Sequence, residues 1–402
     1  TEKSIEGVKV IHHNINTNGI GYLKLSFNID KVEDELLPYV GLLTKVLGSI
    51  GTEKYSFVEL SNAMDIRTGG ISFGSAGTTF VKPAQGYRYA LNVTGKALYG
   101  DLAALTELMD EIMNHTVYDD YKRLKEIIGE TKAGMQMRMQ GSGNAVGVAE
   151  LTAQINESGA IRKRISGRGF YRFLDDAYKN FDEKKSEIIA GLKRVMEALF
   201  TRENMTVSYT ADDEGFFYLG NAMKKISEKL PAGSGKIYPF AAPKENLNEG
   251  FTSSSKVNYV AHCGTFAGSG YSYTGALRIL KVMLSYDYLW INIRVKGGAY
   301  GCMSGIGRSG EGYFVSYRDP EVKKSDDIYL GIPDYLENFE ADERTMTKYV
   351  IGTISDIDTP LTPSLQGSRG LSAWYSGVTD EMLKKEREEI LNATVEDIRA
   401  LA

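Results

Sequence analysis

The stretch Leu-Trp-Ile-Asn-Ile-Arg-Val-Lys-Gly-Gly-Ala-Tyr-Gly at residues 289–301 joins an apolar helical pattern to a glycine-rich turn and a strand. Arg294 stands at the end of the helical part and Tyr300 enters the strand, so both side chains can reach one place across the turn. A guanidinium and a phenol both donate hydrogen bonds and add no negative charge. Such a pair suits a polarised oxygen, for example a peptide carbonyl that is becoming an oxyanion.

The same stretch also has a purely structural explanation. Two glycines after a helix form a common C-terminal cap, and an arginine near that end complements the helix dipole. Tyr300 can be an ordinary half-buried strand residue. The spacing alone leaves both explanations open, because such short motifs need a structural context to confirm them.

The stretch is one copy of an internal repeat. Residues 65–72 align with residues 292–300 at an offset of 228, with one extra residue before the glycines of the second copy. Ser72 stands where Tyr300 stands, so the donor pair exists only in the second copy. In both copies a helix precedes the motif, and a hairpin and more helices follow it. This order predicts an α+β fold of two homologous domains, each a mainly antiparallel sheet with helices packed on one face.

The repeat also suggests domain boundaries. We expect a first domain at 1–230, a linker rich in Pro, Gly and Ser at 231–255, and a second domain at 256–402 that carries the Arg/Tyr motif. A strand at 205–209 is expected to end the first domain. Its counterpart would lie beyond residue 402, so the second domain is either shorter or cut at its C-terminus. A cut would leave one sheet edge unpaired.

Further local patterns give specific expectations. One helix is predicted over residues 277–291, because its apolar residues recur every three or four positions. Another is predicted over 326–339. The run Gly-Ser-Gly-Asn at 141–144 interrupts a long helical region, and Asn144 is expected to cap the helix that follows.

The motif Arg-x-Lys-Gly-Gly-Ala-Tyr-Gly after a helix resembles the C-terminal half of the pitrilysin/insulinase (inverzincin) zinc peptidases, in particular the presequence-protease branch. The segments at 38–43, 67–72 and 352–361 are similar to that branch as well. The resemblance implies that Arg294 and Tyr300 hydrogen-bond the substrate backbone beside the zinc ion. It also implies substrate contacts at the adjoining Gly297 and Gly298. Where that branch has a histidine before a helix, this chain has Asn144, so any role of that imidazole is lost or taken by an amide.

The histidines of this chain do not form a zinc motif. There are four, and none follows the spacing His-x-x-Glu-His or His-Glu-x-x-His. His12 and His13 are adjacent and would point to opposite faces of a strand. The same objection holds for His262 and Cys263, and His115 reads as a surface or cap residue near a helix end. We therefore predict no metal site in this chain. The resemblance implies that zinc, its ligands and the general base belong to the N-terminal half.

Composition narrows the class of protein. The net charge is −5 and the sequence pI is near 5.6, which argues against a nucleic-acid-binding protein. Cys263 and Cys302 are too few for a disulfide framework. We expect free buried thiols, although the two could meet if their strands pair. No apolar run is long enough for a membrane span. The chain begins with Thr1 and can be an excised piece of a longer protein. A bacterial cytoplasm is expected rather than a mitochondrial or plastid matrix.

The chain is therefore predicted to be the C-terminal, substrate-binding half of a zinc metalloendopeptidase that degrades unstructured peptides. Its partners would be the N-terminal half of the same polypeptide and those peptides, with no nucleic acid and no membrane, and the chain alone would be inactive. The alternative is a non-catalytic structural or peptide-binding subunit of the same superfamily. The retained pair of Arg294 and Tyr300 favours the first hypothesis. A stand-alone enzyme finds no support, because the sequence shows no nucleophile–base set.

Overall fold

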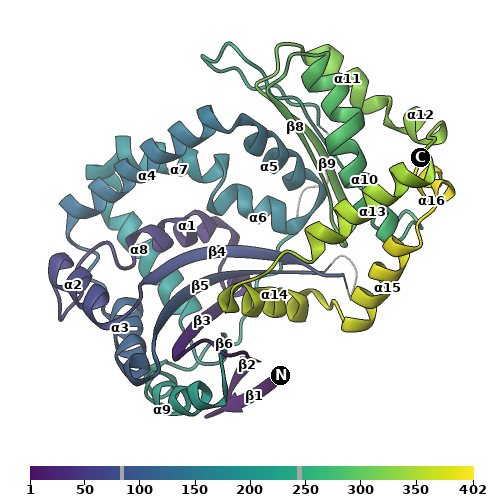
Figure 1. Ribbon diagram of the computed structural model, residues 1–402. Coiled ribbons are helices and arrows are strands. Elements are labelled where there is room, and N and C mark those ends of the chain that lie inside the picture. The colour runs from purple at the N-terminus through teal and green to yellow at the C-terminus, as the bar shows by residue number, and fades with distance from the viewer. Residues whose placement is uncertain (82–85, 242–246) are drawn as a thin grey trace.

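The computed structural model describes residues 1–81, 86–241 and 247–402. Within these ranges the strands form two sheets (Figure 1). The large sheet has the order β1-β2-β6-β3-β5-β4, and the small sheet has the order β7-β9-β8. Only the β2–β6 pair is parallel among the described strand pairs, which confirms the predicted α+β fold with mainly antiparallel sheets. The strands are β1 (Glu2–Ile5), β2 (Val8–Asn14), β3 (Ile20–Asn28), β4 (Ile71–Thr79), β5 (Tyr87–Leu98), β6 (Met205–Ala211), β7 (Ala261–Thr265), β8 (Gly301–Ile306) and β9 (Glu311–Tyr317).

The core of the first unit lies on one face of the large sheet. Leu23, Leu25 and Phe27 alternate along β3 and are fully buried, as a strand with one apolar face requires. Helices from the same unit cover this core face, and Lys24 and Ser26 point to the other face. The helices of this unit are α1 (Leu37–Val46), α2 (Phe57–Arg67), α3 (Leu102–His115), α4 (Tyr121–Gly141), α5 (Gly143–Ile155), α6 (Glu157–Ile165), α7 (Arg168–Lys179), α8 (Phe181–Leu199) and α9 (Asp213–Lys229), with short 3₁₀ turns η1 (Ile29–Lys31), η2 (Asp34–Leu36) and η3 (Tyr99–Asp101).

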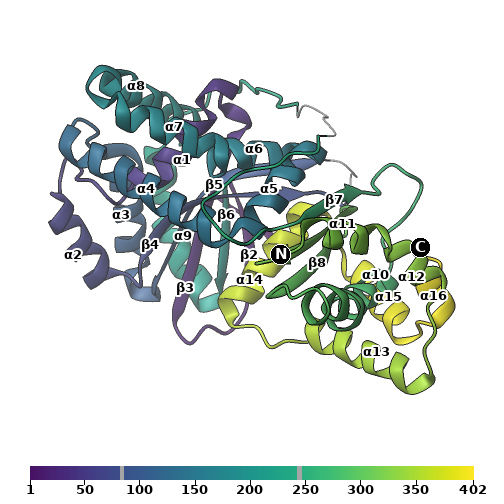
Figure 2. The same cartoon turned by 90° about the horizontal axis from the view of Figure 1, so that it is seen from above.

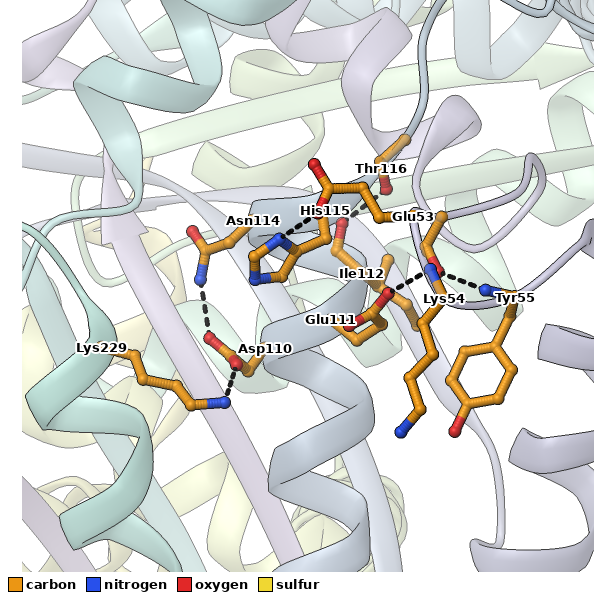
Figure 3. Close-up of polar contacts among 11 residues, drawn as sticks. Glu53, Lys54, Tyr55, Asp110, Glu111, Ile112, Asn114, His115, Thr116 and Lys229 are labelled. Atoms are coloured by element: carbon orange, nitrogen blue, oxygen red, sulfur yellow. Dashed lines mark hydrogen bonds and ion pairs between the residues drawn. The ribbon is translucent and has the colours of Figure 1, made fainter.

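Helix α9 corrects the expectation that the strand at 205–209 ends the first unit. The carboxylate of Asp212 caps α9 by accepting a hydrogen bond of 3.0 Å from the main-chain N–H of Gly215. At its other end, Lys229 donates to the buried carboxylate of Asp110 on α3 at 2.6 Å (Figure 3). The apolar spacing that signals this helix is present in the sequence and was not used. Its buried residues include Leu219, Met223 and Ile226.

The second unit surrounds the small sheet with shorter helices. The helix predicted over 277–291 begins as α10 but continues as two π-helical segments, η4 and η5. The helix predicted over 326–339 is in fact two helices that meet at Gly331, because Pro333 in the first turn of α12 lacks an N–H and disfavours continuation. The elements are α10 (Gly275–Met283), η4 (Leu284–Tyr288), η5 (Trp290–Val295), α11 (Val322–Leu330), α12 (Ile332–Glu337), α13 (Glu343–Ile357), α14 (Pro363–Ser376), α15 (Asp380–Leu391) and α16 (Val395–Arg399).

The two sheets repeat one arrangement. The neighbours β3-β5-β4 correspond to β7-β9-β8, with the motif preceding β4 and β8. In the large sheet β3 also pairs with β6, whereas no described strand pairs with the outer edge of β7. The stretch between the units has no helix or strand over 231–241 and 247–255, and residues 242–246 of the predicted linker lie outside the described residues. The division into 1–230 and 256–402 stays a prediction.

Each unit lends a helix to the sheet of the other (Figures 1 and 2). Helix α14 packs on β2, β4 and β6 of the large sheet, on the face opposite the core, and α5 packs on β7 and β9 of the small sheet. Glycines permit the close approach. A Cβ atom at Gly367 would lie 1.8 Å from Oγ1 of Thr210, and one at Gly370 would lie 2.8 Å from Nδ1 of His13. The helices α5 and α14 hold the same place in the order of the two copies, so the exchange is reciprocal.

The beginning of α5 corrects a second expectation. The cap position is Ser142, and Asn144 lies inside the first turn of the helix rather than before it. The side-chain amide of Asn144 instead donates a hydrogen bond of 3.7 Å to Sδ of Met303 on β8. Asn144 therefore does not cap α5. It ties that helix to the small sheet.

Candidate functional site

Arg294 lies on the π-helical segment η5, at the end of the long helix of the second unit. The wider turn is visible in the hydrogen bond of 2.9 Å from the N–H of Lys296 to the carbonyl oxygen of Ile291, five residues back. Segments of this kind inside helices are frequent at functional sites. The helix then stops at Gly298, whose φ of +80° is the left-handed conformation that glycine adopts most readily.

The structure brings Tyr300 next to Arg294. Its N–H donates to the carbonyl oxygen of Tyr317 on β9 at 2.9 Å, which fixes the residue immediately before β8. Nη1 of Arg294 donates to the main-chain carbonyl oxygen of Tyr300. The Tyr300 residue is 66% exposed, and Cζ of Arg294 lies 5.9 Å from the centre of its ring. The two predicted donors thus meet at the surface, through the backbone of one and the side chain of the other.

Two further residues belong to this cluster and were missed in the sequence. Cζ of Arg294 lies 4.5 Å from the ring centre of Trp290, one helical turn earlier, in a cation–π contact. On the other side, Cζ of Arg318 lies 5.9 Å from the ring centre of Tyr300. The spacing of four residues between Trp290 and Arg294 could have been noticed, since such pairs share one helix face. Arg318 has no such signal, because it arrives through the pairing of Gly301 with Tyr317.

The cluster, defined as Trp290, Arg294, Tyr300 and Arg318, carries two positive charges. Among the described residues, neither guanidinium has an ion pair with a carboxylate. Arg294 also acts on its neighbourhood. Burial raises the pKa of the Cys302 thiol to about 11, and the charge of Arg294 opposes that rise. The cluster is therefore chemically suited to hold a carbonyl oxygen or a carboxylate.

Gly297 and Gly298 have structural reasons to be glycine. A Cβ atom at Gly297 would lie 2.4 Å from the carbonyl oxygen of Ile293, so no larger residue fits at this helix end. Gly298 is exposed and takes the positive φ of the cap. The structural explanation of the motif and the donor pair therefore coexist in the same turn. A substrate contact at either glycine remains a prediction.

The four histidines lie apart and have other partners. His12 and His13 point to opposite faces of β2, as predicted. His115 is at the end of α3 beside Glu53 (Figure 3), and His262 on β7 meets a carboxylate on α11. The contacts of their ring nitrogens are His12 Nε2 with the carbonyl oxygen of Ala211 at 3.0 Å, His13 Nε2 with Oγ of Ser208 at 3.1 Å, His115 Nδ1 with Oε2 of Glu53 at 3.2 Å, and His262 Nε2 with Oδ1 of Asp326 at 2.8 Å.

No zinc ligand set can be assembled from the part of the chain that the structure describes. Over these residues no three side chains of His, Cys, Asp or Glu come together in a way that could hold a metal ion. Cys263 and Cys302 are both free thiols. They lie on β7 and β8, and β9 runs between those strands. The residues present therefore do not fit a zinc ion.

The comparisons with known proteins agree with this structure. Residues 1–176 match a family described as associated with peptidases of family M16, subfamily C, and residues 248–402 match the PreP C-terminal domain. The chain is 41% identical over 401 residues to Protein HypA of Clostridium perfringens. It is 32% identical over 400 residues to Presequence protease 1, chloroplastic/mitochondrial, of Arabidopsis thaliana. These alignments cover 100% and 99% of this chain but 41% and 37% of the relatives, so the chain spans about two fifths of their length.

Solved structures share the fold at low sequence identity. A protease from Helicobacter pylori superposes with a TM-score of 0.66 at 13% identity, covering 100% of this chain and 95% of that chain. The peptidase M16 inactive domain from Pseudomonas fluorescens gives 0.65 at 16% identity, with 100% and 93% covered. Over the described ranges, every helix is too short or too polar to span a lipid bilayer. From the matched domains and the presequence-protease relatives, the chain belongs to the presequence-protease branch of the pitrilysin/insulinase peptidase family, as its C-terminal half.

Proposed function

We propose that this chain is the substrate-binding half of a zinc metalloendopeptidase that degrades unstructured peptides. The observation that carries the proposal is the exposed pairing of Arg294 with Tyr300, in a chain that belongs to a peptidase family. Zinc, its ligands and the general base would belong to the N-terminal half. Because the residues of this chain do not fit a metal ion, their contribution is limited to binding and orientation.

Arg294 is suited to hold the substrate backbone. A guanidinium has five N–H donors in a fixed plane, and the bond to the carbonyl of Tyr300 occupies one nitrogen. The Trp290 ring beneath it restrains the guanidinium plane, so little side-chain entropy is lost when a carbonyl oxygen binds. The remaining N–H groups can donate to the carbonyl of an extended peptide as its oxygen gains negative charge.

Tyr300 is suited to act beside it. Its phenol is at the surface, and the two arginines near its ring add positive potential. A phenol that donates to the same oxygen, or to the next peptide unit, would fix the register of the bound peptide. The counterpart in the first unit, Ser72, cannot reach as far, so only the second unit is equipped for this role.

The first test is peptidase activity on an unstructured fluorogenic peptide with zinc supplied. This chain alone is compared with this chain mixed with the upstream half of its polypeptide. We expect activity only in the mixture, abolished by a chelator and by Arg294→Ala. Arg172→Gln, at an exposed position on α7, serves as the control and should retain full activity. Activity of this chain alone would contradict the proposal. Two folded halves without activity would favour the non-catalytic, peptide-binding subunit.

We further infer a bacterial cytoplasm as the location. The support is a bacterial relative at 41% identity and two unpaired thiols, which suit a reducing compartment. Fractionation of cells that produce the tagged full-length protein tests this. Recovery with the membrane or the periplasm would refute it.

A further inference from the structure

A cleft of about 710 Å³ opens between the polar face of the large sheet and the end of α14. It lies away from η5 in the sequence and is built by β2, β3, β5 and β6 together with the exchanged helix. Its lining includes Lys9, Arg88 and Arg202 from the first unit and Trp374 and Tyr375 from the second. The cleft therefore exists only because the two units exchange helices.

The face of the sheet that forms this cleft is basic. The strands β2 to β6 contain no aspartate or glutamate, and their charged residues are three lysines and one arginine. The register places all four on the face opposite the core, since Lys9 is paired with Thr206, Thr206 with Ser26, and Ser26 with Asn92. The four residues are Lys9, Lys24, Arg88 and Lys96. In a chain of net charge −5, such a face attracts anions.

Two donors at the cleft have no acceptor. Nε of Arg88 and the hydroxyl of Tyr375 are shielded from water and make no hydrogen bond with any described residue. The two side chains touch one another, with Cζ of Arg88 4.7 Å from the ring centre of Tyr375. The one hydrogen bond of the guanidinium, from Nη2 to the carbonyl oxygen of Ser26, is long at 3.5 Å. Unmet buried donors destabilise a structure, so a ligand that supplies acceptors here gains that free energy.

The other charged groups of the cleft are already engaged. Nε of Arg202 donates to the carbonyl oxygen of Ser227 at 2.8 Å. The carboxylate of Glu203 accepts from the N–H of Gly233 at 2.5 Å, and this bond lowers the pKa of Glu203. Lys9 pairs with Glu2 at 3.2 Å, and its Nζ lies 5.4 Å from the ring centre of Trp374. Arg88 and Tyr375 are thus the groups with donors to offer.

We propose that this cleft binds the C-terminal carboxylate of an extended peptide, with Arg88 and Tyr375 donating to its two oxygens. A carboxylate has two acceptor oxygens in one plane and matches an arginine N–H and a neighbouring hydroxyl. Apolar surface beside them, from Trp374, Tyr87 and Met205, suits an apolar last side chain. That the occupant is a peptide rests on the proposed function, whereas the preference for a carboxylate does not. The polar face would then hold one end of a peptide away from the Arg294 cluster.

The test is a binding measurement that needs no hydrolysis. The chain has two tryptophans, so in a Trp290→Phe background the fluorescence of Trp374 reports on the cleft alone. The probe is an acetylated, tryptophan-free pentapeptide that ends in leucine, with either a free carboxyl or an amide at its C-terminus. We expect the free acid to bind at least about tenfold more tightly than the amide. Arg88→Gln and Tyr375→Phe should each remove most of that difference, and Arg172→Gln should leave it unchanged.

Further arms separate the sources of the carboxylate. An amidated pentapeptide with an internal glutamate that binds as tightly as the free acid would overturn the assignment to a peptide terminus. Inorganic phosphate that displaces the peptide with equal affinity would make this a general anion site and would also overturn it. Equal binding of acid and amide would refute the carboxylate preference. Thermal melts of the variants show whether each remains folded, and Tyr375→Phe, which removes only one oxygen, keeps the test valid if Arg88→Gln does not fold. Loss of peptidase activity plays no part, so failure here is distinct from failure of the proposed function.

Discussion

Arg294 donates a hydrogen bond from Nη1 to the main-chain carbonyl oxygen of Tyr300, six residues further along the chain. The contact uses the backbone of Tyr300, so the identity of its side chain is not needed to hold Arg294. Position and chemistry are therefore separable at this site, and substitutions of the tyrosine can be interpreted without a change of fold.

Tyr300→Phe should lower the turnover of the full-length enzyme about 10²- to 10³-fold, as expected when one donor to a developing oxyanion is lost. The thermal melting temperature should not change, because Tyr300 is 66% exposed. Steady-state kinetics on an unstructured peptide and a melting curve of the same preparation check both statements. Normal turnover would remove Tyr300 from the proposed role.

Glu386→Gln should destabilise the chain by about 3–5 kcal/mol. This buried carboxylate on α15 lies between Arg278 on α10 and Arg308 of the β8–β9 hairpin, and its Oε2 accepts from Nε of Arg308 at 2.7 Å. Removing its charge leaves two partly buried guanidiniums without a partner. Glu388→Gln, exposed on the same helix, is the matched control and should change the free energy of unfolding by less than about 0.5 kcal/mol. Urea denaturation measures both, and equal values for the two variants would contradict the prediction.

Gly367→Ala should destabilise the exchange of α14 by about 1–3 kcal/mol. The new Cβ would lie 1.8 Å from Oγ1 of Thr210 on β6, so the helix must move away from the sheet. The control is Gly134→Ala in α4, where nothing lies within 4 Å of the added atom. There the better helix propensity of alanine should stabilise by up to about 1 kcal/mol.

Thr210→Ala in the Gly367→Ala background removes the nearest atom but leaves the Cβ of residue 210 at 2.9 Å. It should restore part of the lost stability. Denaturation midpoints of the four proteins decide the matter. If both glycine variants were stabilised alike, α14 would not be packed as closely as described.

Acid should destabilise the chain through His13 before its carboxylates titrate. Burial against β6 and α14 lowers the pKa of His13 from 6.5 to about 4. The unfolded chain therefore takes up a proton below pH 6.5 that the folded chain refuses, and stability present above pH 6.5 is lost as the pH falls towards 4. Burial also lowers the pKa of His12 in the same direction.

In His13→Gln the decrease in melting temperature between pH 7 and pH 4.5 should be smaller than in the unmodified chain. His115→Gln, at an exposed site on the end of α3, is the control and should retain the original decrease. A pH profile of His13→Gln that overlays that of the unmodified chain would show that this imidazole is not shielded from water.

The sequence predicted the parts of the site that depend on local order. A helix, a glycine turn and a strand were enough to bring Arg294 near Tyr300, and the repeat was enough to match the hairpin at β4 with that at β8. The π-helical turn of η5 was not predicted, because apolar residues spaced three or four apart do not reveal a widened hydrogen-bond register. Arg318 was missed because it reaches Tyr300 only through the pairing of β8 with β9.

The exchange of helices was beyond the sequence for a related reason. The pattern of α14 tells which of its sides is buried, but not which sheet buries it. Likewise, the failure of Asn144 as a cap follows from a helix boundary earlier than expected, and boundaries of this kind are the least certain feature of a sequence pattern. The basic face of the large sheet could have been noticed, since β2 to β6 lack acidic residues.

During synthesis the large sheet must wait for its second covering. Strand β2 leaves the ribosome about 350 residues before α14, which at ordinary translation speeds corresponds to roughly 20–70 s. A nascent chain with an apolar face open for that time would invite aggregation. The lysines, serines and threonines on this side of β2, β3, β5 and β6 let it stay in water until α14 arrives. The polar character of this face, which attracts a ligand in the finished protein, thus also protects the unfinished one.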